Sequence, residues 1–368
     1  MRNEMAPAAS PYIPSLDGIR ALSFLLVFLA HAGLGEVLIP GGFGVTVFFV
    51  LSGFLITTLL RLEFARSGRI SLGAFYLRRV LRILPPLYIT LVFAMVVHRL
   101  GGHPGIPVAG TLAQALQVSN YYQIYASPSV TIPGTDVFWS LAIEEHFYLL
   151  FPLLYLWMCG RLPAGRQAVL LLGLCVAVLA WRCLLHFHFH AGLTRVYYGT
   201  DTRFDALLFG CVFAIIASPV LRDPLHDWLL RRTFWLLPLC LIVLLGTFLV
   251  RDAAFRDTLR YTLQGVALIP LFIAAIHYRK SWPVRFLNLP LVRFVGVLSY
   301  SLYLCHSIII YQCNMLVARG AIGKWVVGPV LIGVVSLAVS LCFAILVYYG
   351  VERPCARLRK QLSSGVKG

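Results

Sequence analysis

Gly44-Val-Thr-Val-Phe-Phe-Val-Leu-Ser-Gly-Phe-Leu-Ile56 is an apolar run without a single charged residue. With its flanks it forms a stretch, 43–61, long enough to cross a bilayer as a helix, which takes about 17–25 residues. Such stretches recur along the whole chain of 368 residues, of which 60% are hydrophobic and 12% charged. A soluble domain is about 45–50% apolar and about 25% charged, so a water-soluble enzyme is excluded. The runs are continuous rather than alternating, which indicates membrane helices and not a membrane β-barrel.

The apolar stretches predict an all-α polytopic membrane protein with about ten transmembrane helices. The predicted spans are 15–34, 43–61, 83–99, 139–158, 168–186, 204–221, 233–250, 259–277, 294–317 and 325–350. We expect residues 15–350 to form one membrane domain, between a cytoplasmic segment 1–14 and a short cytoplasmic tail 351–368. With so short a tail, we expect no appended extracytoplasmic domain. The small-x-small pattern around His31 leaves a cleaved signal sequence as the alternative interpretation of the first span.

The distribution of basic residues predicts the orientation of the chain. The formal net charge is +17. If the N-terminus is cytoplasmic, 22 Lys and Arg residues fall on the cytoplasmic side and 8 on the other, with Arg182 inside a span. This asymmetry satisfies the positive-inside rule, so we expect both termini in the cytoplasm and no role for nucleic acid. The nine cysteines show no metal-ligand spacing, and we expect neither a metal site nor a disulfide framework.

Ionisable residues inside spans are costly and are therefore candidates for function. Arg20 and His31 are eleven positions apart. On an α-helix this spacing leaves them within about 20° of one another and about 16 Å apart along the axis. They therefore line one face of the first span, although an interfacial Arg and an interhelical hydrogen bond of the His remain the alternative.

Arg79 and Arg82 also share a helix face, at the predicted entry to the third span. Such a pair suits a phosphate-bearing ligand, whereas anionic lipid is the alternative partner.

Three further clusters combine polar side chains with predicted spans. Glu144 and Glu145 are adjacent within the first turns of the fourth span, so at least one should face a wet cavity. Tyr303 and His306 lie three apart on one helix face, where interhelical hydrogen bonding is the alternative to a functional role. Asp205 follows Arg203 closely, and the two could form a local ion pair or a polar lining.

These segments together resemble the acyltransferase type 3 family of integral-membrane acyltransferases. The motifs that carry the resemblance occur in the family's order along nearly the whole chain: Leu16-Asp-Gly-Ile-Arg20 with His31, Gly44–Ile56, Arg79-x-x-Arg82-Ile-Leu-Pro85, Trp139-Ser-Leu-Ala-Ile-Glu144, Arg203-Phe-Asp-Ala-Leu207, Ser299-Tyr-Ser-Leu-Tyr-Leu-Cys-His306 and Val351-Glu-Arg-Pro354. The resemblance implies a ten-helix bundle that takes an acyl group, commonly acetyl, from cytoplasmic acyl-coenzyme A. It delivers the group to a hydroxyl of a surface glycan or glycolipid across the membrane.

On this basis we expect His31 to act as general base, because histidine readily exchanges a proton near neutral pH. Glu144 would orient the acceptor or carry a second proton, and a covalent acyl-histidine remains an alternative. Asp17 and Arg20 would position the donor or the backbone. Arg20, Arg79 and Arg82 are assigned to the donor coenzyme. The residues assigned to substrate binding are Trp139, Glu145, Asp205, Tyr303 and His306. We expect no permanently bound cofactor, only acyl-CoA as co-substrate.

The resemblance places the protein in the bacterial inner membrane. Its acceptor could be lipopolysaccharide O-antigen, exopolysaccharide, peptidoglycan or a small secreted metabolite. The competing function is a proton-coupled transporter or glycan flippase, because buried Arg, His and Glu also mark substrate pathways. No inverted repeat supports that alternative.

Overall fold

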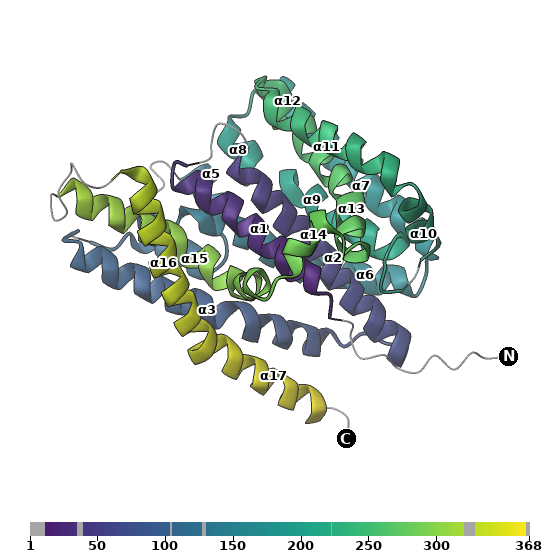
Figure 1. Ribbon diagram of the computed structural model, residues 1–368, viewed down its shortest axis with the longest axis horizontal. Helices are drawn as coiled ribbons and strands as arrows, with labels where there is room; N and C mark the ends of the chain where they lie inside the picture. Colours follow the sequence, from purple (N-terminus) through teal and green to yellow (C-terminus); the bar gives the residue numbers. More distant parts are fainter. Residues whose placement is uncertain are drawn as a thin grey trace.

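The computed structural model describes residues 12–34, 40–103, 105–126, 130–221, 223–319 and 328–365. Within these residues every regular element is a helix and no strand occurs (Figure 1). The all-helical fold class is therefore confirmed. Residues 1–11 and 366–368, together with Arg222 and Lys324 from the charge count, lie outside the described residues.

Each of the ten predicted spans coincides with a helix. These helices are α1 (Pro14–His31), α2 (Gly41–Ser67), α3 (Leu72–Leu100), α6 (Trp139–Cys159), α7 (Ala164–Phe187), α9 (Thr200–Ile216), α11 (Thr233–Leu249), α13 (Leu259–His277), α15 (Pro290–Ala318) and α16 (Pro329–Val347). By length and hydropathy, eight segments of the described chain could cross a membrane. Both α9 and α11 have 17 residues, and α11 meets α10 (Pro224–Arg231) at a bend of 86°. The chain is thus an integral membrane protein by composition and length, whereas the count of ten stays a prediction.

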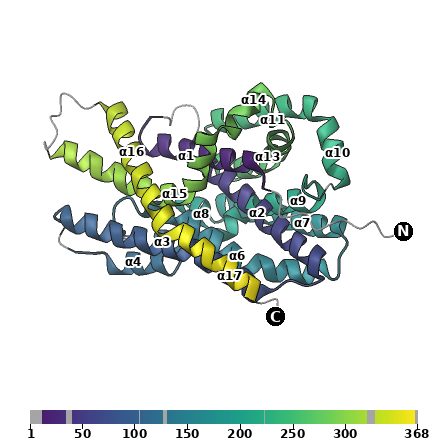
Figure 2. The ribbon, with the colours of Figure 1, turned by 60° about the horizontal axis from the view of Figure 1, so that its bottom comes forward.

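Shorter helices fill the connections. They are α4 (Val108–Ala115), α5 (Ser119–Tyr125), η1 (Asp136–Phe138), α8 (Leu193–Tyr198), α12 (Ala253–Asp257), α14 (Trp282–Arg285), η2 (Phe286–Asn288), the π-helical turn η3 (Tyr348–Glu352) and α17 (Arg353–Gly365). In its described residues, the polar segment between α3 and α6 therefore contains three short helices. In Figures 1 and 2, α17 continues from α16 and runs beside α3, which it contacts.

The helix that contains the third predicted span, α3, begins at Leu72, well before the predicted start of the span at residue 83. Gly68, at φ 67°, ends α2, and the Ser71 hydroxyl caps α3 by accepting from the Ala74 N–H at 3.4 Å. The connection is therefore only 68–71, and Arg79 and Arg82 lie inside the helix. Arginines interrupt a hydropathy pattern but not a helix when they face a polar interior, which is why the sequence misplaced this boundary.

Small residues bring the central helices together. Gly53 of α2 and Gly210 of α9 face one another, and a methyl group on either would overlap the backbone of the other helix. Gly296 of α15 likewise abuts the Asp17 carbonyl of α1. Such close approach is the usual mode of helix packing in membranes, where van der Waals contact replaces the hydrophobic effect as the driving force. The helices α1, α2, α9 and α15 thus form the framework on which the polar residues are arranged.

A buried ion pair joins α7 to α9. Arg182 Nη2 lies 2.7 Å from Asp205 Oδ2, and both side chains are fully buried. The Thr262 hydroxyl also donates to Asp205, at 3.0 Å, and Arg182 donates to the Thr202 carbonyl at 2.7 Å. Of the two alternatives for Arg203 and Asp205, the local ion pair does not form, because the aspartate binds the arginine of a neighbouring helix.

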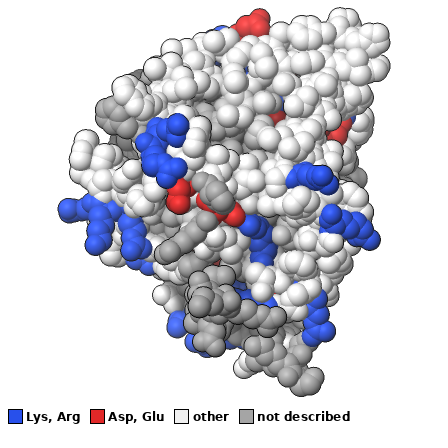
Figure 3. Space-filling view, turned by 90° about the vertical axis from the view of Figure 1, so that its right-hand side faces the viewer, with Lys and Arg blue, Asp and Glu red and all other residues white. Residues whose placement is uncertain are grey.

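The two ends of the bundle are identified by the residues at which α1 and α2 finish. We call the end at which α1 finishes the His31 end, and the end at which α2 finishes at Ser67 the Ser67 end. Figure 3, which views the right-hand side of Figure 1, shows more Lys and Arg than Asp and Glu side chains on the visible face. The cytoplasmic position of the termini stays a prediction.

Candidate functional site: an arginine cavity and a histidine pair

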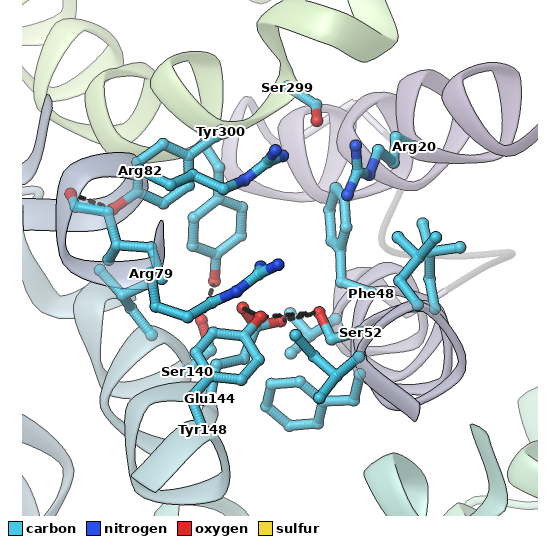
Figure 4. Close-up of a pocket in the computed structure, with 18 residues that line it drawn as sticks. Arg20, Phe48, Ser52, Arg79, Arg82, Ser140, Glu144, Tyr148, Ser299 and Tyr300 are labelled. Atoms are coloured by element: carbon cyan, nitrogen blue, oxygen red, sulfur yellow. Dashed lines mark hydrogen bonds between the residues drawn. The ribbon is translucent and has the colours of Figure 1, made fainter. Parts of the chain in front are cut away.

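A polar cavity lies among α1, α2, α3, α6 and α15 (Figure 4). Its free volume is about 100 Å³. The polar side chains on its wall are Arg20, Ser52, Arg79, Arg82, Ser140, Glu144, Tyr148, Ser299, Tyr300 and Tyr303. We call this the arginine cavity. This volume is too small for a whole nucleotide.

Three guanidinium groups from two helices define the cavity. Figure 4 shows Arg20, Arg79 and Arg82 directed towards one space. Arg79 stacks over the rings of Phe75 and Tyr148, each at 5.6 Å, and its buried Nε has no hydrogen-bond partner among the described residues. The nearest carboxylate oxygen to Arg20 belongs to Asp17, at 3.7 Å. Three cations in one small space with so few partners can bind an anion, and guanidinium groups suit phosphate oxygens.

Glu144 is the one carboxylate on the described cavity wall. It accepts hydrogen bonds from the Ser52 hydroxyl at 2.9 Å and from the Tyr148 hydroxyl at 3.0 Å. Glu145, the adjacent candidate, does not line the cavity, and its buried Oε1 has no partner among the described residues. Of the two carboxylates, the structure places Glu144 in the cavity.

Several residues near the cavity were not identified as site candidates from the sequence. Ser52 and Tyr148 hold Glu144, and Tyr300 donates to the Ile83 carbonyl at 2.9 Å. Glu352 accepts from the Ser301 hydroxyl at 2.5 Å and interacts electrostatically with the nearby arginines Arg82 and Arg20. Tyr148 follows Glu144 by four residues, a spacing that signals a shared helix face. Ser52 and Glu352 lie in motifs that carried the resemblance, but nothing in their spacing indicated contact with the arginines.

Two histidines lie together at the His31 end. His31 is the last residue of α1 and is exposed, whereas His306 of α15 is fully buried. Nδ1 of His31 is 2.9 Å from the Val27 carbonyl and 3.4 Å from Nε2 of His306. Nδ1 of His306 is 2.8 Å from the Tyr303 carbonyl. The structure thus joins two candidates that the sequence identified separately.

These contacts fix the tautomers of the neutral pair. A carbonyl accepts and cannot donate, so Nδ1 of His306 carries its hydrogen and Nε2 holds the lone pair. That lone pair and the Val27 carbonyl both face Nδ1 of His31, which therefore carries hydrogen as well. Nε2 of His31 is left with its lone pair on an exposed ring. This atom can accept a proton.

Tyr303 connects the arginine cavity to the histidine pair. Its hydroxyl shares a 2.6 Å hydrogen bond with Ser140 on the cavity wall. Its ring centroid lies 5.7 Å from that of His306 and 6.0 Å from that of Phe48, another wall residue. One layer of aromatic side chains therefore separates the anion site from His31.

The other predicted site residues lie outside the cavity. Asp17 accepts from the Tyr12 hydroxyl at 2.6 Å, beside Arg20. Trp139 packs against Tyr197 and Tyr198, at centroid distances of 4.8 and 5.0 Å. Asp205 is held in the buried pair with Arg182 described above. Their assignments to catalysis or substrate binding stay predictions. Among the described residues, no three His, Cys, Asp or Glu side chains are grouped to hold a metal ion.

Comparison with known proteins identifies the family. O-acetyltransferase OatA of Staphylococcus aureus (strain NCTC 8325 / PS 47) is 32% identical over 362 residues, which cover 93% of this chain and 57% of OatA. A second Staphylococcus aureus (strain COL) protein, also named as an O-acetyltransferase, is 30% identical over 365 residues with the same coverage. The chain therefore spans 57% of the length of these curated relatives. No solved structure matches it. The family model described as an acyltransferase domain matches residues 13–349, and the chain belongs to the acyltransferase type 3 family.

Proposed function

We propose that the protein is a membrane-embedded O-acetyltransferase of the bacterial inner membrane. It transfers an acetyl group from acyl-CoA to a hydroxyl of a glycan or glycolipid at the His31 end. The observation that carries this proposal is the juxtaposition of an anion-binding cavity and a histidine with a free lone pair, joined through Tyr303, in a chain of an acyltransferase family.

The arginine cavity suits the pyrophosphate of coenzyme A. Bidentate guanidinium contacts to phosphate oxygens favour Arg over any other side chain there. A neighbouring cavity of about 260 Å³ lies between the start of α3 and α17, with Arg78 and Arg359 on its wall. Its basic residues and larger volume suit the nucleotide end of the donor, which the arginine cavity is too small to hold. The pantetheine arm would then extend past Phe48 and Tyr303 towards His31.

In the proposed reaction His31 acts as a general base. Nε2 takes the proton of the acceptor hydroxyl while the hydroxyl oxygen attacks the thioester carbonyl carbon. The C–S bond then breaks, the coenzyme A sulfur takes the proton from His31, and the acetyl ester is released. His306 holds the His31 ring by accepting from Nδ1. An acyl-histidine formed at the same Nε2 is the alternative route.

The experiment that tests this function compares cells that carry the gene, lack it, or express a His31→Ala variant at equal level. Mass spectrometry of their surface glycans should show acetyl esters only with the wild-type chain. A glycan that is exported less but acetylated to the same extent would favour the flippase alternative instead.

A further inference from the structure

A second cavity opens at the His31 end, away from the arginine cavity. Its volume is about 420 Å³, within the range of about 300–1,000 Å³ that is typical of small-molecule sites. It is formed by the start of α2, by α8, by the end of α11 and by α12 and α13. The helices α8 and α12 contact one another at the top of Figure 1. We call it the outer cavity.

The charge of the outer cavity is positive. Arg251, Arg256 and Arg260 line it, and its described wall contains no Asp or Glu. Arg260 is buried, with its Nη2 donating to the Tyr261 hydroxyl at 2.7 Å, and its Nε has no partner among the described residues. Neither Arg256 nor Arg260 forms an ion pair within the described part of the chain. Topology alone does not explain these cations, because the positive-inside rule disfavours arginine at this end.

A further buried cation lies behind the wall. Arg203 is fully buried, and its guanidinium stacks 3.7 Å from the Tyr261 ring, which lines the cavity. Its bond to the Thr46 hydroxyl at 3.2 Å leaves Nε and Nη1 without partners in the described structure. Burying a guanidinium with few hydrogen-bond partners costs free energy, and an anion in the adjoining cavity would lower that free-energy cost.

The rest of the wall suits a sugar. The aromatic rings of Tyr197, Tyr198 and Tyr261 offer flat apolar surfaces, and Thr194 and Gln264 add polar groups. The hydroxyls of Tyr197 and Tyr198 make no hydrogen bond to any described residue. Gly42 keeps space for the Tyr197 hydroxyl, because a Cβ there would lie 2.7 Å from it. Aromatic faces combined with free hydroxyls and cations can bind a saccharide that carries an acidic group.

The outer cavity is close to the histidine that the proposed function makes the base. Gly41 lines the cavity, and its backbone packs against Ala30, the residue before His31. We propose that the outer cavity binds the acceptor, and that the acceptor is a saccharide bearing a carboxylate or a phosphate. Its oxyanion sits on Arg256 and Arg260 while a hydroxyl of the same molecule reaches His31. The role as acceptor site rests on the proposed acetyl transfer, whereas binding of the anionic saccharide can be measured without it.

Binding to the purified full chain in neutral-lipid nanodiscs tests the inference by calorimetry. The probes are a hexuronate, a hexose phosphate, the neutral hexose and inorganic phosphate. We expect one of the two acidic sugars to bind at least about tenfold more tightly than both the neutral sugar and inorganic phosphate. The neutral sugar lacks the charge-assisted hydrogen bonds to the arginines, and inorganic phosphate lacks the ring that packs on the tyrosines. The acidic sugar that binds identifies the source of the anion. Equal binding of acidic and neutral sugars, equal binding of inorganic phosphate, or no binding at all overturns the proposal.

Two variants localise the binding. Arg256→Glu reverses the charge of a half-buried wall residue and should lower the affinity for the acidic sugar at least about tenfold. Arg285→Glu, which reverses the charge of an exposed arginine in another segment, is the matched control and should leave the affinity unchanged. Equal affinities of wild type and Arg256→Glu for the acidic sugar would show that the sugar does not bind at the outer cavity. Loss of acidic-sugar binding in anionic-lipid nanodiscs would assign the cavity to lipid headgroups and would likewise overturn it. If the sugar binds as expected but no acetyl group is ever transferred, the proposed function fails and the binding site stands.

Discussion

Nδ1 of His31 and Nε2 of His306 lie 3.4 Å apart, although the residues are separated by 275 positions and belong to different helices. The buried histidine has its own Nδ1 committed to the Tyr303 carbonyl, so it can only accept from its partner. The exposed histidine is thereby left with one lone pair, at Nε2. This arrangement assigns different roles to two chemically identical side chains, and several predictions depend on it.

His31→Ala should abolish acetyl transfer because it removes the proposed base. General-base removal typically costs about 10²–10⁴-fold in rate. The affinity for acetyl-CoA should be unchanged, since the arginine cavity does not include this side chain. Turnover by the purified variant and calorimetric donor binding measure both quantities. His188→Ala, at another exposed histidine, is the control, and full turnover of His31→Ala would exclude the assignment.

His306→Phe should keep a ring packed against Phe24 and Phe28 but remove one of the two acceptors that face Nδ1 of His31. We expect kcat to fall about tenfold, the equivalent of one lost hydrogen bond, with KM for acetyl-CoA nearly unchanged. Because Gln offers an amide oxygen as acceptor, His306→Gln should retain more activity than His306→Phe. The Val27 carbonyl still accepts from Nδ1 of His31, so the tautomer should stay the same in the Phe variant, whereas the ¹⁵N chemical shift of Nδ1 should change because one of its two acceptors is lost. An unchanged shift would mean that His306 only fills space.

Arg82→Ala should weaken acetyl-CoA binding by about tenfold or more, because it removes one guanidinium from the anion site. Arg82→Lys should restore only part of the affinity, since an ammonium cannot form a bidentate contact. Arg161→Ala, at an exposed arginine beyond the end of α6, is the matched control. Calorimetry measures the affinity of the three variants for acetyl-CoA. Equal donor affinity in wild type and Arg82→Ala would assign this arginine to lipid or topology.

Asp205→Asn should destabilise the protein rather than alter its substrate preference. It leaves Arg182 as an unpaired buried charge, and breaking a buried pair typically costs about 3–5 kcal/mol. Thermal unfolding should show a lower midpoint than for wild type, and Asp227→Asn at an exposed position should not. The folded fraction should bind acetyl-CoA normally. A variant of wild-type stability that fails to bind acceptor would instead support a role for Asp205 in substrate binding.

Much of the fold was predictable because hydropathy reports directly on membrane helices. All ten predicted spans fall on helices, and the largest boundary error lies at Arg79 and Arg82. There the helix continues through charged residues that face a cavity, so the apolar pattern begins later than the helix does. The charge asymmetry gave a prediction of the orientation. It did not predict why arginines line the outer cavity, because the positive-inside rule disfavours arginine at that end.

The site was predictable only as separate helix faces. The periodicity aligned Arg20 with His31 and Tyr303 with His306, because residues on one helix have a fixed geometry. Nothing in the sequence placed His306 against His31, or Asp205 against Arg182, since these contacts depend on how helices far apart in the chain are packed. The same limit kept Glu352 from being recognised near Arg20 and Arg82.

We expect the donor to bind at the arginine cavity and the acetyl group to be transferred at the His31 end. Sided acetyl transfer can be measured in sealed proteoliposomes, with acceptor glycolipid in both leaflets and the orientation determined by protease access to a tag after α17. Charged acetyl-CoA does not cross the bilayer and can be supplied on one side only. Acetylated glycolipid should form only when acetyl-CoA is on the side of the Ser67 end, and none should form with His31→Ala. Equal transfer from both sides, or transfer only with donor at the His31 end, would show that the donor does not bind from the Ser67 end.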